Sequence, residues 1–388
     1  MNIGVFTDTY LPSINGIVTS VEIFRKELEK NGHKVYIFCP KVRKYARKTK
    51  DQEKGGNIFR YFSMPYPLLR EFRLVIPFPS KLKSIKKLRL DIIHFHTPLL
   101  MGVFASYLSK RLKIPLIQTF HTHLIEYLHY VPLPKKVTIP FTIWGIKKYC
   151  HASTFVISPS TLIKNTLIDY GVKTDIAIIP TGTEVLKQAP LSPEQIKKKY
   201  RIPLDKRILI YIGRLAKEKN IFFLFKAFSL INKKIPNCLF ILIGDGPERS
   251  RLMHKARKMG LANKILFLGY IEHKETMNIL SVSDIFIFSS ITETQGLCLL
   301  EAMSKQIPVV AVKAMGVIDI IMSNQGGYLV EEDEVIFSDK VIALLNNKEL
   351  YREKSKQALE VANRFTAGNL TKELLCYYDK ALKIFSKS

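Results

Sequence analysis

The sequence predicts an α/β protein made of two doubly wound domains and a long C-terminal helix. Short apolar runs alternate with helical patterns, and this series occurs twice along the chain. The runs are nearly continuous, as is typical of parallel strands covered by helices on both faces. Two such series predict two Rossmann-like sheets. The expected strands are Ile3–Phe6, Val35–Phe38, Ile92–Phe95, Leu116–Phe120, Thr154–Ile157 and Ile176–Ile179 in the first half, and Ile208–Ile212, Leu239–Ile243, Ile265–Leu268, Ile285–Phe288, Val309–Val312 and Gly327–Val330 in the second.

The domain boundary is expected within Glu184 to Pro203, where prolines and the run Lys197 to Lys199 cluster. We therefore assign residues 1–190 to an N-terminal domain, 191–365 to a C-terminal domain and 366–388 to a terminal helix that packs back on the N-terminal domain. A length of 388 residues is sufficient for two cores of ordinary size.

Composition indicates a globular protein, with 47% hydrophobic and 24% charged residues. The five cysteines are scattered and lack C-x-x-C spacing, which is typical of reduced thiols in a cytosolic protein. The first residues carry no basic leader and place an acid, Asp8, inside their apolar run, so we expect no secretory signal. The sequence therefore predicts a cytoplasmic protein.

A net charge of +27 is concentrated in the first part of the chain. Residues 1–150 carry 26 Lys and Arg against 9 Asp and Glu, a balance of +17. Two acid-free blocks, Lys41 to Lys50 and Lys81 to Leu90, contain six and five of these bases. Such blocks bind polyanions, so nucleic acid and an anionic lipid surface are both candidate partners.

A third basic segment, Val131 to Cys150, favours lipid. Ten residues from Val137 to Ile146 are nearly all apolar and are flanked on both sides by lysine pairs. They are too few to span a bilayer, which requires roughly 20. They suit an interfacial helix with Phe141 and Trp144 in the headgroup layer, and equally a helix buried between domains. Neither an RNA-binding pattern of aromatic and basic residues nor a helix-turn-helix signature occurs, so no nucleic-acid partner is expected.

The segment Glu293 to Glu301 is the most informative part of the sequence. It places two carboxylates eight residues apart across the junction between a loop and a helix that begins near Gly296. The N–H groups of the first helical turn can bind a phosphate, while the two carboxylates bind hydroxyl groups. This arrangement indicates a sugar-nucleotide site. Ordinary helix capping by Glu293 and a solvated Glu301 are the alternative interpretation.

Further loops at expected strand ends fit the same ligand. Gly16 follows a turn-rich loop and lets backbone N–H groups approach a phosphate, although a plain turn has the same appearance. Arg214 and Lys219 follow a strand and can neutralise a diphosphate leaving group. The loop at Gly244 lacks the third glycine of the dinucleotide fingerprint, because Arg249 occupies that position. No Walker A sequence and no Asp-x-Asp sequence occurs.

Four histidines lie in two pairs at expected strand ends, His94 with His96 and His121 with His123. A zinc site is one interpretation, but no Cys, Asp or Glu accompanies them at a known spacing. We favour a neutral His121 that hydrogen-bonds a sugar hydroxyl near the reacting carbon. No metal site and no cofactor is expected.

Together these motifs resemble the retaining glycosyltransferases of family 4. The segments that carry the resemblance are Asn15-Gly16, Thr119-Phe-His121-Thr-His123, Gly213-Arg214 with Glu218-Lys219-Asn220, Gly244-Asp-Gly-Pro, and Glu293-x7-Glu301-Ala-Met followed by Ile307-Pro-Val-Val310. The resemblance implies a GT-B architecture, in which two Rossmann-like domains face each other across a cleft. It also implies that members need no metal for chemistry. Gln306 departs from the pattern, because many relatives have glycine there.

The resemblance also implies roles for individual residues. Gly16, Arg214 and Lys219 would hold the diphosphate, Glu293 the donor sugar, Glu301 the ribose and His121 the reacting sugar. The implied donor site comprises Gly16, Arg214, Lys219, Gly244, Glu293, Thr294, Gln295, Gly296, Leu297 and Glu301, and catalysis is assigned to His121, Arg214, Lys219 and Glu293.

A finer resemblance is to the diacylglycerol glucosyltransferases and related lipid mannosyltransferases, carried by Thr119 to Tyr130 and Thr292 to Gly296. It implies a hexosyltransferase, with UDP-glucose favoured as donor and a lipid acceptor, peripheral on the inner face of the cell membrane. The candidate acceptor residues are Asp8, Tyr10, Glu126 and Tyr127. A soluble transferase acting on a sugar, a thiol or a lipopolysaccharide core is the alternative, and a basic nucleic-acid-binding protein is the alternative outside catalysis.

Overall fold

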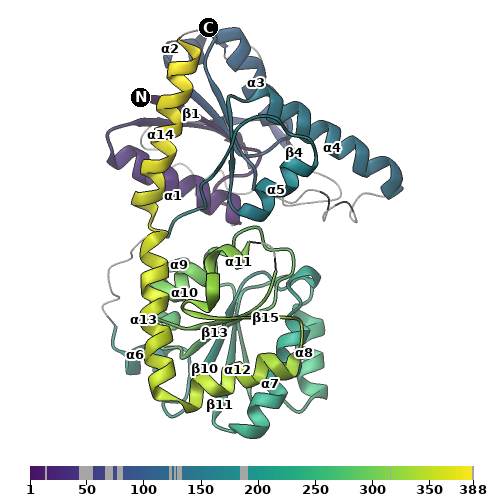
Figure 1. Cartoon of the computed structure of the whole chain (residues 1–388), viewed down its shortest axis with the longest axis vertical. Helices are drawn as coiled ribbons and strands as arrows, with labels where there is room; N and C mark the ends of the chain where they lie inside the picture. Colours follow the sequence, from purple (N-terminus) through teal and green to yellow (C-terminus); the bar gives the residue numbers. More distant parts are fainter. Residues whose placement is uncertain are drawn as a thin grey trace. The chain divides into compact units, whose positions relative to one another are not determined.

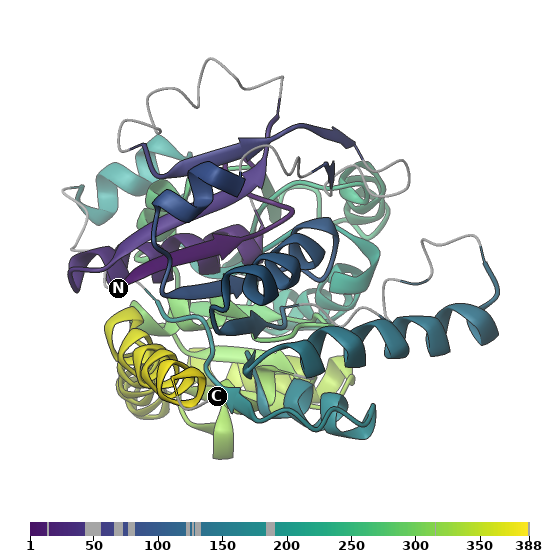
Figure 2. The ribbon, with the colours of Figure 1, turned by 90° about the horizontal axis from the view of Figure 1, so that it is seen from above.

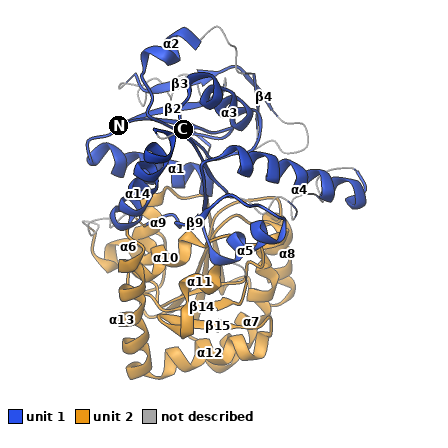
Figure 3. Cartoon of the chain, turned by 45° about the horizontal axis from the view of Figure 1, so that its top comes forward, with its two compact units in different colours: residues 1–182, 367–388 blue, residues 183–366 orange. Residues whose placement is uncertain are grey.

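The computed structural model describes residues 1–13, 15–42, 56–65, 73–76, 82–121, 125, 128, 133–183, 191–314 and 316–386 (Figure 1). The chain forms two compact units, coloured separately in Figure 3. Unit 1 consists of Met1–Gly182 together with Ala367–Ser388, and unit 2 of Thr183–Thr366. The chain thus builds most of unit 1, then unit 2, and returns to unit 1 with its last helix.

Unit 1 is built on a parallel sheet of seven strands. Its strands are β1 (Asn2–Phe6), β2 (Lys34–Pro40), β3 (Ile58–Tyr61), β6 (Ile92–Phe95), β7 (Leu116–Thr119), β8 (Phe155–Ser158) and β9 (Ile176–Ile178), and a separate antiparallel pair consists of β4 (Ser63–Pro65) and β5 (Arg73–Val75). The spatial order is β3-β2-β1-β6-β7-β8-β9. Ile3 of β1 lies opposite Val35 of β2 on one side and Ile92 of β6 on the other.

The helices of unit 1 are α1 (Gly16–Lys30), α2 (Leu82–Lys87), α3 (Leu100–Leu112), α4 (Lys135–Ala152), α5 (Thr161–Asp169) and α14 (Ala367–Phe385). α14 packs against α1, although the two lie at opposite ends of the sequence (Figure 1). Its buried face follows helical spacing through Leu370, Leu374, Tyr378 and Ala381. α4 projects from the body of unit 1 (Figure 2).

Unit 2 is built on a parallel sheet of six strands. The strands are β10 (Arg207–Ile212), β11 (Cys238–Ile243), β12 (Ile265–Gly269), β13 (Ile285–Phe288), β14 (Val309–Val312) and β15 (Gly327–Val330), in the order β12-β11-β10-β13-β14-β15. The helices are α6 (Pro193–Lys199), α7 (Ile221–Lys234), α8 (Arg249–Lys258), α9 (His273–Leu280), α10 (Leu297–Ser304), α11 (Val317–Ile320), α12 (Glu334–Asn346) and α13 (Lys348–Arg364), with 3-10 turns η4 (Lys217–Lys219) and η5 (Met322–Asn324).

Strand order reverses once in each sheet, between β1 and β6 in unit 1 and between β10 and β13 in unit 2. At such a switch point the loops at the carboxyl ends of the two central strands turn to opposite faces of the sheet and leave a crevice where ligands bind. The loops after β1, β6, β10 and β13 therefore hold the positions in which functional side chains are expected.

The predicted strands and the α/β fold are confirmed, because each predicted apolar run lies within or overlaps a strand. Most of these strands are almost wholly buried, whereas β12 and β15 are largely half-buried. The core of unit 1 includes Phe6 stacked on Phe38, with ring centroids 4.3 Å apart. The short edge strand β3 was not predicted. It contains Arg60 and is mostly half-buried, so it lacks the continuous apolar run of the central strands. Within the described ranges, no helix has the length and apolar character needed to cross a bilayer.

Candidate functional site

Two of the predicted site residues meet at the switch point of unit 2. Lys219 ends η4 after β10, and Glu293 lies in the loop after β13. Lys219 Nζ is 2.7 Å from Glu293 Oε2 and 3.4 Å from Ser290 Oγ. The two charged side chains are 20% and 22% exposed, so the ion pair is partly shielded from water but accessible. A cation suited to phosphate and a carboxylate suited to hydroxyl groups are thus side by side.

The loop after β13 also fixes the backbone of Lys219. Ser289 is wholly buried, and its hydroxyl donates to the carbonyl oxygens of Lys219 at 2.9 Å and Asn220 at 3.0 Å. These hydrogen bonds connect the loop after β13 to the loop after β10 and hold them together across the switch point. Ser289 and Ser290 were not among the predicted site residues, although their position directly after a strand was a signal that could have identified them.

The remaining predicted residues of this loop enter α10. Gly296 precedes the helix with a φ of 87°, a left-handed conformation that favours glycine. Gln295 is buried, whereas Thr294 and Leu297 are half-buried. The predicted start of the helix is confirmed, and Glu301 lies in its second turn. The Oε1 atom of Glu301 is 2.8 Å from Nε2 of His273, at the start of α9. No sequence pattern pointed to His273.

Gly316 supports the same loop from the opposite side. Its N–H donates to the carbonyl oxygen of Glu293 at 2.9 Å. A Cβ built on Gly316 would lie 2.1 Å from the carbonyl oxygen of Thr294, which is closer than packing allows. The backbone of Glu293 and Thr294 therefore has its present course only because residue 316 has no side chain.

Arg214 lies exposed in the loop between β10 and η4, as expected for a residue that meets a ligand. The neighbouring loop after β11 contains Gly244, with a φ of 137°. A Cβ there would lie 2.0 Å from the carbonyl oxygen of Gly213. Leu215 N–H also donates to Asp245 O at 3.0 Å. Gly244 thus lets the two loops pack backbone against backbone, a role that the sequence did not reveal.

In unit 1, His94, His96 and His121 form a stacked set that we call the histidine column. Successive ring centroids are 4.3 Å and 5.1 Å apart. His96 Nδ1 is 2.8 Å from His121 Nε2, so one ring donates and the other accepts. Burial lowers the pKa of His94 to about 3 and that of His121 to about 4, and it lowers the pKa of His96 well below 6.5. The histidine column is therefore neutral near pH 7. His123, the fourth histidine of the two predicted pairs, lies outside the described residues.

Asp8 is wholly buried after β1, where it supports the start of α3. Its carboxylate accepts hydrogen bonds from Thr97 Oγ1 at 2.6 Å and from Met101 N at 3.2 Å. Met101 is in the first turn of α3, so Asp8 satisfies one of the N–H groups that a helix leaves without an internal partner. Burial raises the pKa of Asp8 to about 7.

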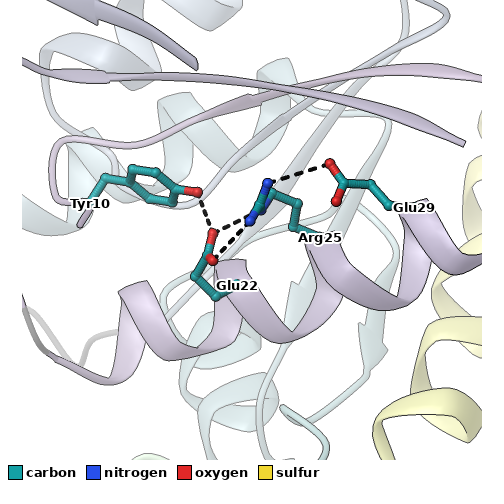
Figure 4. Close-up of polar contacts among 4 residues, drawn as sticks. All are labelled: Tyr10, Glu22, Arg25 and Glu29. Carbon is teal, nitrogen blue, oxygen red and sulfur yellow. Dashed lines mark hydrogen bonds and ion pairs between the residues drawn. The ribbon is translucent and has the colours of Figure 1, made fainter. Parts of the chain in front are cut away.

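Tyr10, another candidate acceptor residue, is also buried, and it hydrogen-bonds Glu22 of α1 (Figure 4). Glu22 in turn binds Arg25 at 3.0 Å. The structure thus places the polar groups of Asp8 and Tyr10 on partners within unit 1, and their contact with an acceptor stays a prediction. Glu126 and Tyr127 lie outside the described residues.

Gly16 begins α1, and the Asn15 side chain caps this helix by accepting from Val18 N at 3.0 Å. A Cβ built on Gly16 would meet no described atom within 4 Å. Packing against the described residues therefore does not require glycine at this position. Among those residues, no group of three or more His, Cys, Asp or Glu side chains is arranged to hold a metal ion.

Comparison with family models and curated proteins gives matches over nearly the whole chain. The model of Glycosyltransferase Family 4 matches residues 14–185, and that of Glycosyl transferases group 1 matches residues 192–361. The alpha-monoglucosyldiacylglycerol synthase of Streptococcus pneumoniae is 32% identical over 317 residues, covering 80% of this chain and 71% of that protein. The enzyme of the same name from Acholeplasma laidlawii is 32% identical over 331 residues, covering 80% of each.

Solved structures share the fold at lower identity. HepE of Anabaena, solved in complex with UDP and glucose, has a TM-score of 0.77 at 17% identity and covers 98% of this chain and 100% of its own. Sucrose-phosphate synthase of Thermosynechococcus elongatus has a TM-score of 0.79 at 19% identity and covers 100% of both chains. These likenesses show the GT-B fold, which consists of two Rossmann-like units.

Proposed function

The chain belongs to glycosyltransferase family 4 and is a glycosyltransferase that uses a nucleotide sugar, and we propose that it transfers glucose from UDP-glucose to 1,2-diacylglycerol with formation of an alpha-glycosidic bond. The names of the two synthases that are 32% identical to this chain support this donor sugar and acceptor. The observation that carries the proposal is the ion pair between Lys219 and Glu293 at the switch point of unit 2.

The ion pair suits a ligand that carries both negative charge and hydroxyl groups. Lys219 would bind the diphosphate as a point charge, and Arg214 would bind it as a planar donor. Glu293 would then accept hydrogen bonds from the donor sugar, and Glu301 from the ribose. Packing against the described residues does not require glycine at position 16. The missing side chain of Gly16 would instead leave room for the diphosphate beside the N-terminus of α1.

Transfer would proceed with retention at the anomeric carbon and without an enzyme nucleophile. Hydrolases that retain configuration through a covalent intermediate use two carboxyl groups flanking the bond that breaks. The carboxylate of Glu293, which contacts Lys219, is instead suited to hold the donor. We therefore place the acceptor hydroxyl on the face of the departing phosphate, which takes its proton while Arg214 and Lys219 stabilise the developing charge. His121, kept neutral by burial, would hydrogen-bond the reacting sugar.

A lipid acceptor requires a surface that meets the membrane, and α4 supplies a suitable one. Val137, Phe141 and Trp144 are 63%, 70% and 55% exposed, and their spacing places them on one face of this projecting helix (Figure 2). Lys148 lies 5.0 Å above the Trp144 ring. Aromatic side chains in the headgroup layer with lysines at anionic phosphates would hold the enzyme at the membrane surface as a peripheral protein.

The catalytic part of the proposal is tested with diacylglycerol vesicles and labelled UDP-glucose. Lys219→Ala and Arg214→Ala are each expected to lower kcat by about 10²-fold or more if they stabilise developing charge. Lys217→Ala, which removes an exposed cation of the same 3-10 turn, is the matched control and is expected to retain turnover. Unchanged turnover in the Lys219 and Arg214 variants would refute the assigned roles. Turnover with GDP-mannose alone would refute the proposed donor.

The membrane surface is tested by flotation with vesicles that contain anionic lipid. The double variant Phe141→Ser with Trp144→Ser is expected to float less than the wild type, because the apolar anchor is removed. Ile168→Ser is the matched control, since Ile168 is 51% exposed on α5 of the same unit. Equal flotation of all proteins would remove α4 from the proposal, and a wild type that never floats would favour a soluble acceptor.

A further inference from the structure

The histidine column is a polar structure within the core of unit 1. His94 is 2% and His96 is 3% exposed. Buried imidazoles cost free energy relative to apolar side chains unless their hydrogen bonds compensate. If these positions served only to fill the core, aliphatic residues would pack there as well. The polar atoms of the column therefore have a use other than filling space.

The bond between His96 and His121 restricts His121 in two ways. The 2.8 Å contact of His96 Nδ1 with His121 Nε2 fixes the rotation of the His121 ring. A hydrogen bond between two neutral rings needs one of these nitrogens to carry the proton and the other to accept it, so the bond also couples the tautomers of the two rings. His121 Nε2 is the ring atom that contacts His96, so the orientation set by this bond also sets where His121 Nδ1 lies.

The far end of the column is anchored by hydroxyl groups on two elements. His94 Nδ1 is 2.7 Å from Tyr378 Oη of α14, and His94 Nε2 is 2.7 Å from Thr119 Oγ1 of β7. Hydroxyls both donate and accept, so either neutral tautomer of His94 is satisfied. The ring of His94 is therefore held in place, and His96 stacks on it at 4.3 Å. The last helix of the chain thus supports a side chain that lies 284 residues earlier.

We propose that His96 is a positioning residue for sugar transfer, which fixes the orientation of His121 and couples its tautomer to that of His96, and that Tyr378 of the C-terminal helix holds the column in place through His94. This inference rests on the proposed role of His121 beside the reacting sugar. It assigns a function to His94, His96 and Tyr378 that acts through His121, and it makes the docking of α14 a requirement for the geometry of the site.

The kinetic test uses two substitutions of His96 in the full-length enzyme. His96→Phe keeps the stacked ring and removes the hydrogen bond, whereas His96→Asn retains a polar atom near the position of Nδ1. We expect His96→Phe to lower kcat by about 10- to 100-fold with little change in the KM for UDP-glucose, because a misplaced catalytic group mainly affects the chemical step. His96→Asn should recover most of the loss. Tyr378→Phe should give a smaller fall in kcat, and Tyr377→Phe, its neighbour on α14, should give none.

A second measurement needs no substrate. In the wild-type protein labelled with 15N at histidine, a coupling through the hydrogen bond is expected between His96 Nδ1 and His121 Nε2, with His121 in a single tautomer. In His96→Asn, the His121 signals should shift. A mixture of His121 tautomers without coupling would overturn the inference, as would a folded His96→Phe enzyme with at least half of the wild-type kcat. If the wild type fails to turn over UDP-glucose with diacylglycerol, the proposed function fails while the NMR result still decides the inference.

Discussion

The Asp8→Asn substitution is expected to remove a pH dependence from the stability of unit 1. Burial raises the pKa of Asp8 from 3.8 to about 7 in the folded protein. A raised pKa means that this group stabilises the fold fully below pH 3.8 and that the stability is lost as the pH rises through about 7. Between pH 5 and pH 8 the loss spans about two pH units, which corresponds to about 3 kcal/mol.

Asparagine reproduces the protonated form of Asp8. Its Oδ1 can accept from Met101 N, as Asp8 Oδ1 does at 3.2 Å, and its Nδ2 can donate to Thr97 Oγ1 in place of the short contact at Oδ2. The variant therefore keeps both connections to α3 and avoids the buried charge. It is expected to match the wild type only near pH 3.8 and below, and its advantage in stability over the wild type should grow by about 3 kcal/mol between pH 5 and pH 8.

The assay must report unit 1 alone, because a protein of two units need not unfold in one step. Protein is equilibrated in urea at each pH and then labelled by a brief hydrogen-exchange pulse at one fixed pH, and peptides from β1 and α3 are followed by mass spectrometry. Asp169→Asn, at an exposed position of the same unit, controls for the loss of one carboxylate. A difference between Asp8→Asn and the wild type that stays constant from pH 5 to pH 8 would refute the reasoning.

The remaining predictions concern the histidine column, the loop after β13 and one buried amide. Burial lowers the pKa of His121 from 6.5 to about 4, so its contribution to stability is present above pH 6.5 and is lost as the pH falls through about 4. The same pulse-labelling assay should show this loss, which is about 3 kcal/mol. Gly316→Ala should lower kcat by about 10-fold or more by displacing the loop after β13, whereas Gly145→Ala in α4, where a Cβ meets no described atom within 4 Å, should not. Gln118 is wholly buried, and its amide has no hydrogen-bond partner among the described residues. Gln118→Met should therefore raise the free energy of unfolding by about 1 kcal/mol or more in urea titrations. An unchanged midpoint of unfolding would contradict this prediction.

The central strands were predictable because burial on both faces leaves a continuous apolar run in the sequence. The same pattern located the loops at their carboxyl ends, which is why Lys219 and Glu293 were both identified. That they form an ion pair depends on β10 lying beside β13, and this neighbourhood is a property of strand order rather than of local sequence. The contact of Tyr378 with His94 depends in the same way on where α14 docks.

Other features were beyond sequence reasoning because they depend on backbone coordinates. Gly244 and Gly316 have no motif that distinguishes packing from ligand approach, and only the position of the facing carbonyl oxygens shows that a Cβ cannot fit. Asp8 illustrates the same limit for side chains. Asp8, a candidate acceptor residue, also accepts a hydrogen bond from the N-terminus of α3, a contact that the sequence did not indicate. Helix N–H groups and ligand hydroxyls attract the same carboxylate, so residue type alone does not separate the two uses.

Buried polar residues in unit 1 gather where its strands end. Their hydrogen-bond partners indicate whether each side chain stabilises a loop or supports the candidate site. Thr7 donates to Thr9 O and Ser158 to Ser160 O, so these hydroxyls satisfy the turns that follow β1 and β8. Ser289 does the same for the backbone of Lys219 in unit 2. Such side chains stabilise loop geometry, because a buried backbone group without a partner would cost free energy. The histidine column differs, because His96 and His121 bond to each other through their side chains and satisfy no backbone group with that contact. At a strand end, a side chain whose hydrogen bond orients another side chain does not stabilise the loop backbone, so its role is better assigned to the candidate site. His96 is such a side chain, which supports its role as a positioning residue.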